Sequence, residues 1–425
     1  MKIQNRRNAA VRKGEEGIVI LVAAIVLLFV VAAIAALAID LVTFYAARSQ
    51  AQLAADSAAL AGARVLANSG TTSNPSDNGL FLSARGLAQS FATQVATSNA
   101  IGGRNLTAAE VVVTPPGAAG TDLRISVQVT RTDLPTFFAR IWGRTTAAVS
   151  VTATAEAYNP SGLNTIAGQA PPVAPVCVKP WILPNQSPKG GAIFDQNTGQ
   201  IEDLTLLGWG DGGNSFFARC RTCVSPFPVP NAWQYYPMAN DAVTYPAPLQ
   251  GLADCNIVLN NDYQRSIAGC VSTPVNCNSD VNIDTLAHNT RNSDTAVAVN
   301  CLTNAVNNKG DQVDDTPPNR SFQFLGGDDN PIVSARNKDV LVSDSVVTVP
   351  VFDSSAGNVT NPVHIIGFVQ LFLNSDGNST PTGGPTRGHI KTTIVNLVGC
   401  GRNATGTPVV GNGASAVPVR LITPP

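Results

Sequence analysis

The chain has 425 residues, of which only 13% are charged, and its formal net charge is −1 at pH 7. Soluble domains usually carry about 25% charged residues, and nucleic-acid binding needs a dense basic surface. No basic cluster occurs beyond the N-terminal tail, so composition argues against a nucleic-acid-binding protein. The length predicts two or three domains, and 36 glycines with 29 prolines indicate turn-rich β structure.

The N-terminus combines a basic tail with a long apolar run. Five Lys or Arg residues occur within the first 13 positions, and residues 18–39 contain no charged side chain. At 1.5 Å rise per residue, a helix over this run is about 33 Å long and can cross a bilayer. The sequence predicts a cytoplasmic tail at 1–17 and a transmembrane helix at 18–39. Everything that follows is exported, because the basic side stays in the cytoplasm.

Two kinds of processing compete with an uncleaved anchor. Ala36-Leu37-Ala38 is a plausible cleavage site for a secretory signal, which would leave a soluble exported protein. The run is long for such a signal, and residues 40–67 contain one glycine and no proline to end the helix. Prepilin processing normally requires a Glu five residues past the glycine, but valine occupies that place after Gly14 and Gly17. We therefore expect an uncleaved single span.

Residues 40–69 predict that the helix continues as an Ala-rich stalk. Ala, Leu, Gln and Arg dominate this segment, and all four are strong helix formers. Small residues recur near helical spacing at Ala51, Ala55, Ala58 and Gly62, which permits close approach of another helix or a sheet. We expect a packed assembly helix. The alternative is a connector that only separates two parts.

The N-terminal region, including this helix, resembles the TadE/TadG-like family. Members of this family are bacterial membrane-anchored proteins linked to assembly of Flp-type tight-adherence pili. The resemblance covers residues 13–67 and rests on Gly14, Gly17, the apolar run and the sequence AADSAALAGA at 54–63, where Ser57 replaces a common Ala. It implies an assembly or surface function and brings no catalytic site. The residues taken as helix-packing or assembly positions are Asp40, Tyr45, Gln52, Ala55, Asp56, Ala58, Ala59 and Gly62.

Residues 70–158 predict a small α+β unit that begins within a polar break at 68–79. Residues 123–130 and 149–155 alternate apolar and polar side chains, as half-buried strands do. Residues 123–157 also resemble a continuation seen in many TadE/TadG-like proteins. Four apolar residues recur on one face of a helix that precedes these strands, namely Leu80, Leu87, Phe91 and Val95.

Between the two strands, Pro135 opens a short predicted helix. We expect its apolar residues to pack on the sheet as ordinary core; they are Phe137, Phe138, Ile141 and Trp142. After the unit, residues 159–175 form a linker of Asn, Pro, Gly and small residues, and its PPVAP end predicts an extended chain.

All eight cysteines lie in the last predicted domain, residues 176–425. An even number confined to an exported domain predicts disulfides, with 105 possible pairings. The candidates are Cys177, Cys220, Cys223, Cys255, Cys270, Cys277, Cys301 and Cys400.

Two regions of this last domain differ in pattern. Residues 185–320 show weak apolar periodicity and indicate long loops. Near the C-terminus, four segments rich in Val, Ile, Phe and Thr favour an antiparallel sheet or sandwich, and Cys400 is expected to tie this sheet to the loop region. The four segments are 345–352, 363–373, 389–398 and 417–422.

Catalytic or metal chemistry has little support in this domain. The CxxC pair at 220–223 has the spacing of a redox or zinc site, but prolines follow it and a second, similarly spaced pair is missing. Alternating oxygen side chains at 280–284 and 374–378 lack the Gly and Glu of a calcium-binding EF-hand. The sequence has no HExxH, GxSxG or DxSxS signature, so we expect no catalytic residue, cofactor or metal.

The sequence thus predicts a non-enzymatic α+β protein of the bacterial inner membrane, with a single span and a periplasmic or surface-exposed C-terminal domain. The first hypothesis is a structural or assembly factor of a Flp/Tad-type pilus. Its expected partners are the membrane, other pilus-assembly or envelope proteins and other copies bound through the N-terminal helix. The alternative is a surface binding module or adhesin carried on the same stalk. An envelope hydrolase or oxidoreductase has no supporting set of residues.

Overall fold

A computed structural model gives the fold of the chain. It describes residues 4–118, 123–159, 173–208, 215–216, 218–219, 227–228, 234–239, 243–244, 259–284, 291–303, 310–314, 323–328, 330, 332–374, 390–400, 409–411 and 415–422. The chain forms two compact units, each made of segments that are distant in sequence. Unit 1 contains Met1–Ala58, Thr93–Val113 and Val127–Ala153, and unit 2 contains Ala59–Ala92, Thr114–Ser126 and Thr154–Pro425.

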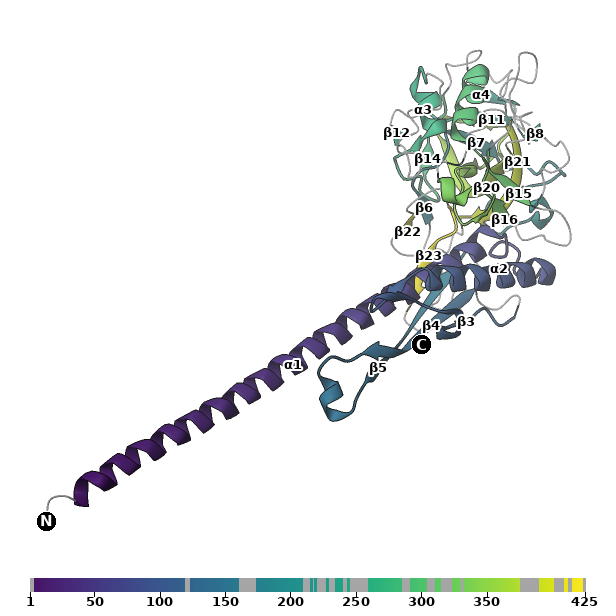
Figure 1. Ribbon diagram of the computed structural model, residues 1–425. Coiled ribbons are helices and arrows are strands. Elements are labelled where there is room, and N and C mark those ends of the chain that lie inside the picture. The colour runs from purple at the N-terminus through teal and green to yellow at the C-terminus, as the bar shows by residue number, and fades with distance from the viewer. Residues whose placement is uncertain are drawn as a thin grey trace. The chain divides into compact units, whose positions relative to one another are not determined.

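The first helix, α1 (Gln4–Asn68), runs without interruption through the predicted tail, span and stalk (Figure 1). From Gly17 onward it is long and apolar enough to cross a membrane. Nearly all large apolar side chains between Ile18 and Ile39 are exposed, for example 69% for Phe29. A helix that is apolar all round and uncovered by protein has the character of a membrane span.

The second helix, α2 (Asn78–Thr97), begins where Asp77 accepts a hydrogen bond from the Leu80 amide at 3.0 Å. The predicted apolar face is only partly right, since Leu80 and Phe91 are buried but Leu87 and Val95 are half-exposed. Phe81 and four alanines form the rest of the buried face, and the small alanine side chains let a neighbouring element approach closely. The buried alanines are Ala84, Ala88, Ala92 and Ala96.

A four-stranded sheet has the order β23-β5-β4-β3. Burial alternates along β4 as the sequence predicted, with Ile125, Val127 and Val129 fully buried. The strands are β3 (Val111–Thr114), β4 (Arg124–Pro135), β5 (Thr146–Ala157) and β23 (Val419–Ile422). Two short strands and a 3-10 turn precede β3, namely β1 (Ala100–Ile101), β2 (Arg104–Asn105) and η1 (Ala108–Glu110).

The loop between β4 and β5, residues 136–145, is here named the hairpin tip. It contains a 3-10 turn, η2 (Ala139–Trp142), in place of the predicted short helix. The expectation that Phe137 packs on the sheet is wrong, because this side chain is 59% exposed. β4 ends at Pro135 and β5 begins at Thr146, so the tip lies outside the paired part of these strands.

The main sheet of unit 2 has eight strands. Seven follow the order β8-β21-β20-β18-β7-β11-β9, and β14 pairs with β20 outside this path. The strands are β7 (Trp181–Pro184), β8 (Ser215–Phe216), β9 (Ala218–Arg219), β11 (Gln234–Pro237), β14 (Asp280–Val281), β18 (Val346–Phe352), β20 (Val363–Leu373) and β21 (Ile390–Gly399).

The prediction of a C-terminal sheet is confirmed for three of its four segments. β18, β20 and β21 are antiparallel neighbours, as expected from their short connections. The fourth segment contains β23, which pairs instead with β5, from Val419 opposite Ala157 to Ile422 opposite Thr154. The main sheet is also mixed, because β7 runs parallel to β18. Every residue of β18 is buried, which is typical of a strand covered on both faces.

Two helices contribute to the core in the region that the sequence analysis assigned to long loops. These are α3 (Asp262–Ala268), capped by the Asn261 side chain, and α4 (Arg291–Leu302). Their apolar side chains join the strand residues in one cluster, so the assignment to loops is wrong here. Members of the cluster include Phe194, Tyr235, Ile267, Val299, Val349, Val369 and Ile394.

Several smaller sheets complete unit 2. The two-stranded ones pair β6 (Val173–Pro175) with β22 (Val409–Gly411), β10 (Phe227–Pro228) with β19 (Asn358–Val359), and β12 (Val243–Thr244) with β13 (Cys270–Val271). A three-stranded sheet contains β15 (Gln312–Asp314), β16 (Gln323–Leu325) and β17 (Asp339–Val340). Together these elements confirm the α+β class with a β-rich C-terminal region.

Candidate functional site

Asp40, the first residue after the apolar run, holds the hairpin tip within unit 1. Its carboxylate is 2% exposed and accepts three backbone hydrogen bonds, from Phe137 at 2.9 Å, Phe138 at 3.0 Å and Ala139 at 2.8 Å. Consecutive amides that converge on one anion form a binding nest, and such charge-assisted bonds are stronger than neutral ones. The carboxylate therefore fixes the tip to the helix at the end of the apolar segment.

Two glutamines on α1 make further contacts in unit 1. Gln50 accepts a hydrogen bond from the Gly102 amide at 2.8 Å, which joins the β1–β2 turn to the helix. Gln52 donates to Asp56 at 2.7 Å along the same helix. Tyr45 differs from both, since its side chain is 67% exposed. Three of the predicted assembly residues thus split into a local pair, Gln52 and Asp56, and one uncovered aromatic, Tyr45.

The small residues of α1 are buried within this chain. Ala55, Ala58 and Ala59 are each 0% exposed. At Gly62 an added Cβ would lie 3.2 Å from the Ala88 carbonyl oxygen, 3.3 Å from the Ala92 Cβ and 2.5 Å from the Ile125 Cδ1. Both α2 and β4 therefore approach the helix closely at Gly62. The close approach that the small residues predicted occurs here between elements of one chain.

A charged cluster holds the end of β4 to the β1–β2 turn in unit 1. Arg104 contacts Glu110 at 2.6 Å and Asp133 at 2.8 Å, and Arg131 contacts Asp133 at 2.9 Å. The hydrogen bond from Arg104 is the main reason that the pKa of Glu110 falls to about 2. The hydrogen bonds from both arginines also lower the pKa of Asp133. The pairing keeps both carboxylates ionised at neutral pH.

A buried polar network in unit 2 joins the end of α1 to the main sheet. Asn396 on β21 donates to the Ala67 carbonyl at 2.6 Å and accepts from Thr72 at 3.2 Å. Ser73 accepts from the Leu397 amide at 2.9 Å and donates to the Leu397 carbonyl at 3.0 Å. Sequence reasoning missed this site, because 68–79 has the composition of a solvated polar break. No local signal identifies a polar turn that is buried by a distant strand.

Two disulfides are located among the described cysteines. Cys177 bonds to Cys270 with an S–S distance of 2.03 Å, and Cys277 bonds to Cys400. The second pair joins the end of β21 to the segment before β14, which confirms the expected tie from Cys400 to the loop region. Cys301 is disulfide-bonded as well. The CxxC pair and Cys255 lie outside the described residues.

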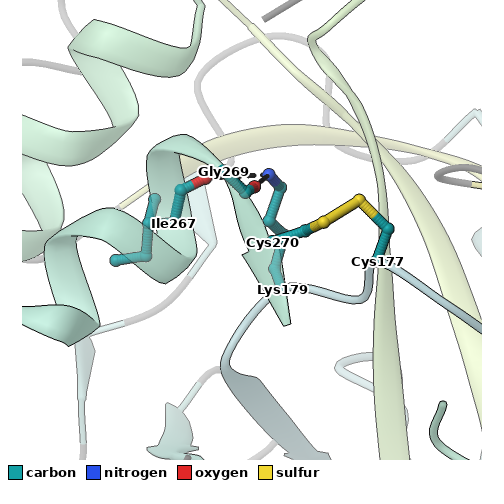
Figure 2. Close-up of a disulfide and its surroundings, with 5 residues drawn as sticks. All are labelled: Cys177, Lys179, Ile267, Gly269 and Cys270. Atoms are coloured by element: carbon teal, nitrogen blue, oxygen red, sulfur yellow. Dashed lines mark hydrogen bonds between the residues drawn. A yellow bond between two sulfur atoms is a disulfide. The ribbon is translucent and has the colours of Figure 1, made fainter. Parts of the chain in front are cut away.

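Lys179 lies beside the first disulfide and is almost fully buried. Its ammonium group donates to the carbonyls of Ile267, at 2.8 Å, and Gly269 at the C-terminal end of α3 (Figure 2). Burial lowers the pKa of Lys179 to about 7, opposed by the charge of Asp344. The last carbonyls of a helix have no partner in the helix, and a lysine satisfies them there. This residue therefore caps α3 where the disulfide joins β13 to the chain before β7.

The other polar candidates make ordinary structural contacts where they are described. Asp280 bonds to His364 at 2.9 Å across the β14–β20 pair. In the segment 374–378 only Asn374 is described, and His288 and His389 also lie outside the described residues. Within the described parts of the chain, no group of three or more His, Cys, Asp or Glu side chains is arranged to hold a metal ion.

Comparison with known proteins supports the family resemblance seen in the N-terminal sequence. The model of the Tad family, described as putative Flp pilus-assembly TadE/G-like, matches residues 17–65. The resemblance predicted for the N-terminal region is thereby confirmed, and the matched segment contains the apolar run, Asp40 and the buried alanine face. No curated protein and no solved structure matches the chain.

The arrangement joins a helix with membrane character to a folded body through two hydrogen-bonded connections. Asp40 holds the hairpin tip in unit 1, and the network around Asn396 holds the end of α1 to β21 in unit 2. The matched family segment ends just before the second of these connections.

Proposed function

We propose that this protein is a single-pass, non-enzymatic envelope protein that serves as a structural or assembly factor of a Flp/Tad-type pilus. The N-terminal tail remains in the cytoplasm, and the disulfide-containing domain is exported to the periplasm or the cell surface. Its partners are other pilus-assembly or envelope proteins, and copies of the chain associate through the N-terminal helix.

The match of residues 17–65 to the TadE/G-like family carries the proposal. Three further observations support it. The apolar part of α1 is uncovered by protein, the helix continues unbroken past the proposed membrane surface, and the domain contains disulfides of the kind used outside the cytoplasm. A continuous helix that leads from the apolar run into a folded domain suits a part that presents this domain outside the membrane.

Deletion and complementation in the native host test the proposal. Loss of the gene is expected to remove Flp-type filaments from the cell surface, counted by electron microscopy, and the wild-type gene to restore them. A variant with Leu28→Arg and Val31→Arg places two charges in the apolar run and is expected to leave the membrane fraction and fail to restore filaments. Leu53→Arg changes an apolar residue that is 66% exposed beyond the run, and is expected to stay in the membrane.

Normal filament numbers in the deletion strain would refute the assembly role. If that strain still made filaments but lost adhesion to a glycan or host surface, the result would favour the adhesin hypothesis. Reporter fusions after Gly70 check orientation, since only a reporter that needs export is expected to be active there.

A further inference from the structure

The hairpin tip is held at a defined position along α1. Asp40 follows the last residue of the apolar run, and its three hydrogen bonds bring residues 137–139 to this level of the helix. At 1.5 Å per residue, the backbone of the tip lies within about one helical turn of the end of the run. When the run spans a bilayer, this level coincides with the lipid headgroups.

The surface of the tip has the chemistry of a headgroup-binding segment. Phe137 is 59% exposed, and Arg140 and Arg144 are exposed beside it. Residues 136–145 contain no Asp or Glu. The carboxylate of Asp40 is negatively charged but buried under three backbone hydrogen bonds, whereas both arginines are exposed, so the charge that the tip presents at its surface is positive. Aromatic side chains favour the membrane interface, and arginine binds lipid phosphates.

Just beyond the apolar run, α1 also has exposed apolar or aromatic side chains on faces other than that of Asp40. Leu41, Val42 and Tyr45 are 53%, 66% and 67% exposed. Exposed apolar side chains that directly follow a membrane span need a partner that is apolar on one side and polar on the other. A lipid headgroup layer meets both requirements and is continuous with the environment of the run.

We propose that the hairpin tip binds the exported face of the bilayer, with Phe137 inserted among the lipids and Arg140 and Arg144 on their phosphates. The inference rests on the membrane anchoring proposed above. The tip then acts as a second membrane contact beside the span. It restricts the tilt of α1 and so fixes the direction in which the helix leaves the membrane.

Depth-dependent fluorescence quenching of the full chain in lipid nanodiscs tests the proposal. Phe137→Trp introduces a fluorescent tryptophan at an exposed position. Its emission is obtained by subtracting the emission of the wild-type protein from that of the variant. In phosphatidylglycerol-containing discs, lipids brominated near the headgroup are expected to quench this emission at least about twofold more than lipids brominated near the chain end. Arg140→Gln combined with Arg144→Gln is expected to weaken the quenching in anionic lipid and to have little effect in phosphatidylcholine.

The matched control is Val112→Trp, a reporter in the same unit that is also exposed, at 56%. Val112 lies on β3, outside the hairpin tip, and the β1–β2 turn that precedes this strand is bonded to Gln50, about 15 Å farther along α1 than Asp40. This control is expected to show no quenching. Equal quenching at both positions, or none at Phe137→Trp, would overturn the proposal.

Alkaline carbonate extraction of native membranes separates this proposal from the one on which it rests. If the protein is released, the anchor is wrong and the tip proposal fails with it. A protein that resists extraction but shows no quenching at the tip refutes only the lipid contact. Protection of Phe137→Trp in native membranes without quenching in nanodiscs would assign the tip to a protein partner and overturn the proposal.

Discussion

At the scale of single residues, the most consequential side chain is Asp40. A carboxylate that ends an apolar run would ordinarily be expected to face water or a basic partner. Here it is buried and bound by three backbone amides of the hairpin tip. The sequence identified this residue by family resemblance, but gave no means of finding amides that lie almost a hundred positions away.

Replacing Asp40 by Asn is expected to release the hairpin tip. The amide side chain removes the charge and offers one acceptor oxygen in place of two, so at least one of the three backbone amides loses its partner. Bonds to a charged group contribute about 1.5–3 kcal/mol each. Hydrogen exchange of the amides at 137–139 should become faster in the variant.

Asp56→Asn is the control for this experiment. Asp56 contacts only Gln52 in the described hydrogen bonds, so exchange at the tip should not change. Unchanged exchange in Asp40→Asn would contradict the role of the carboxylate.

The lowered pKa of Glu110 predicts that the protein loses stability in acid. Its folded pKa is about 2, against an ordinary value of 4.5, because Arg104 binds the ionised form. The contribution to stability is therefore complete above pH 4.5 and is lost as the pH falls towards 2. The melting temperature of the wild-type protein should decrease over this range more steeply than that of Glu110→Gln. Asp262→Asn alters an exposed ion pair with Arg265 and should leave the acid profile unchanged.

The buried Lys179 predicts a further rise in stability with pH, now in the alkaline range. Its folded pKa of about 7 lies below the ordinary 10.5, so between these values the unfolded chain binds a proton that the folded protein releases. The free energy of unfolding should therefore rise with pH from 7 to 10 and be level with respect to this group below 7. Lys179→Met should remove the rise. Lys189→Met is the control, since this exposed lysine also donates to a carbonyl, that of Thr205, at 2.6 Å. A rise that persists in Lys179→Met would assign it to another group.

At the scale of helices and strands, periodic patterns located the elements and small residues determined how closely they pack. The alternation in β4 and the apolar segments of β18, β20 and β21 were predicted from sequence. The buried face of α2 was only partly predicted, because alanine carries a weak apolar signal even where it forms much of the contact. Ala58 is fully buried inside this chain, so Ala58→Leu would disturb the chain's own packing before any assembly contact.

Gly62 and Gly86 provide a matched pair of helix glycines. An added methyl at Gly62 would press on the Ala88 carbonyl oxygen and the Ala92 Cβ, whereas no atom lies within 4 Å of one at Gly86. Gly62→Ala is expected to destabilise unit 2 by about 1–3 kcal/mol through overpacking. Gly86→Ala is expected to stabilise it by about 0.5–1 kcal/mol, because alanine loses less entropy in a helix. Denaturant unfolding measures both values. The close approach at Gly62 would be refuted if both substitutions stabilised the protein equally.

At the scale of the whole molecule, long-range pairing is what the sequence could not provide. It predicted an anchor, an α+β body and a disulfide-containing domain, all from local composition and spacing. It placed residues 417–422 with the other C-terminal strands, whereas β23 pairs with β5 some 260 positions earlier. The burial of 68–73 against β21 and the helices α3 and α4 were also missed. Each of these features depends on contacts between segments that are distant in sequence. Local sequence patterns do not reveal such contacts.

Polar side chains, rather than apolar ones, make the connection between α1 and the main sheet specific. Asn396 bonds to Gln370 on the neighbouring strand as well as to Ala67 at the end of the helix. Asn159 donates to the Leu397 carbonyl at 2.7 Å, which brings the end of β5 to the same point of β21. A buried network of this kind is stable only when its members are satisfied together. It therefore permits one register between the helix end and the sheet, which an apolar contact alone would not fix.

The two located disulfides predict how far covalent closure stabilises unit 2. Cys177–Cys270 and Cys277–Cys400 close loops of 93 and 123 residues. By loop-closure entropy the two should differ by only about 0.2 kcal/mol, and each should contribute about 2–5 kcal/mol. Double alanine variants of each pair should therefore lower the free energy of unfolding by similar amounts in denaturant titrations. A clearly larger loss for the Cys177–Cys270 variant would show that this bond also holds Lys179 against the end of α3. If neither variant lost stability, chain closure would not be what stabilises this loop-rich domain.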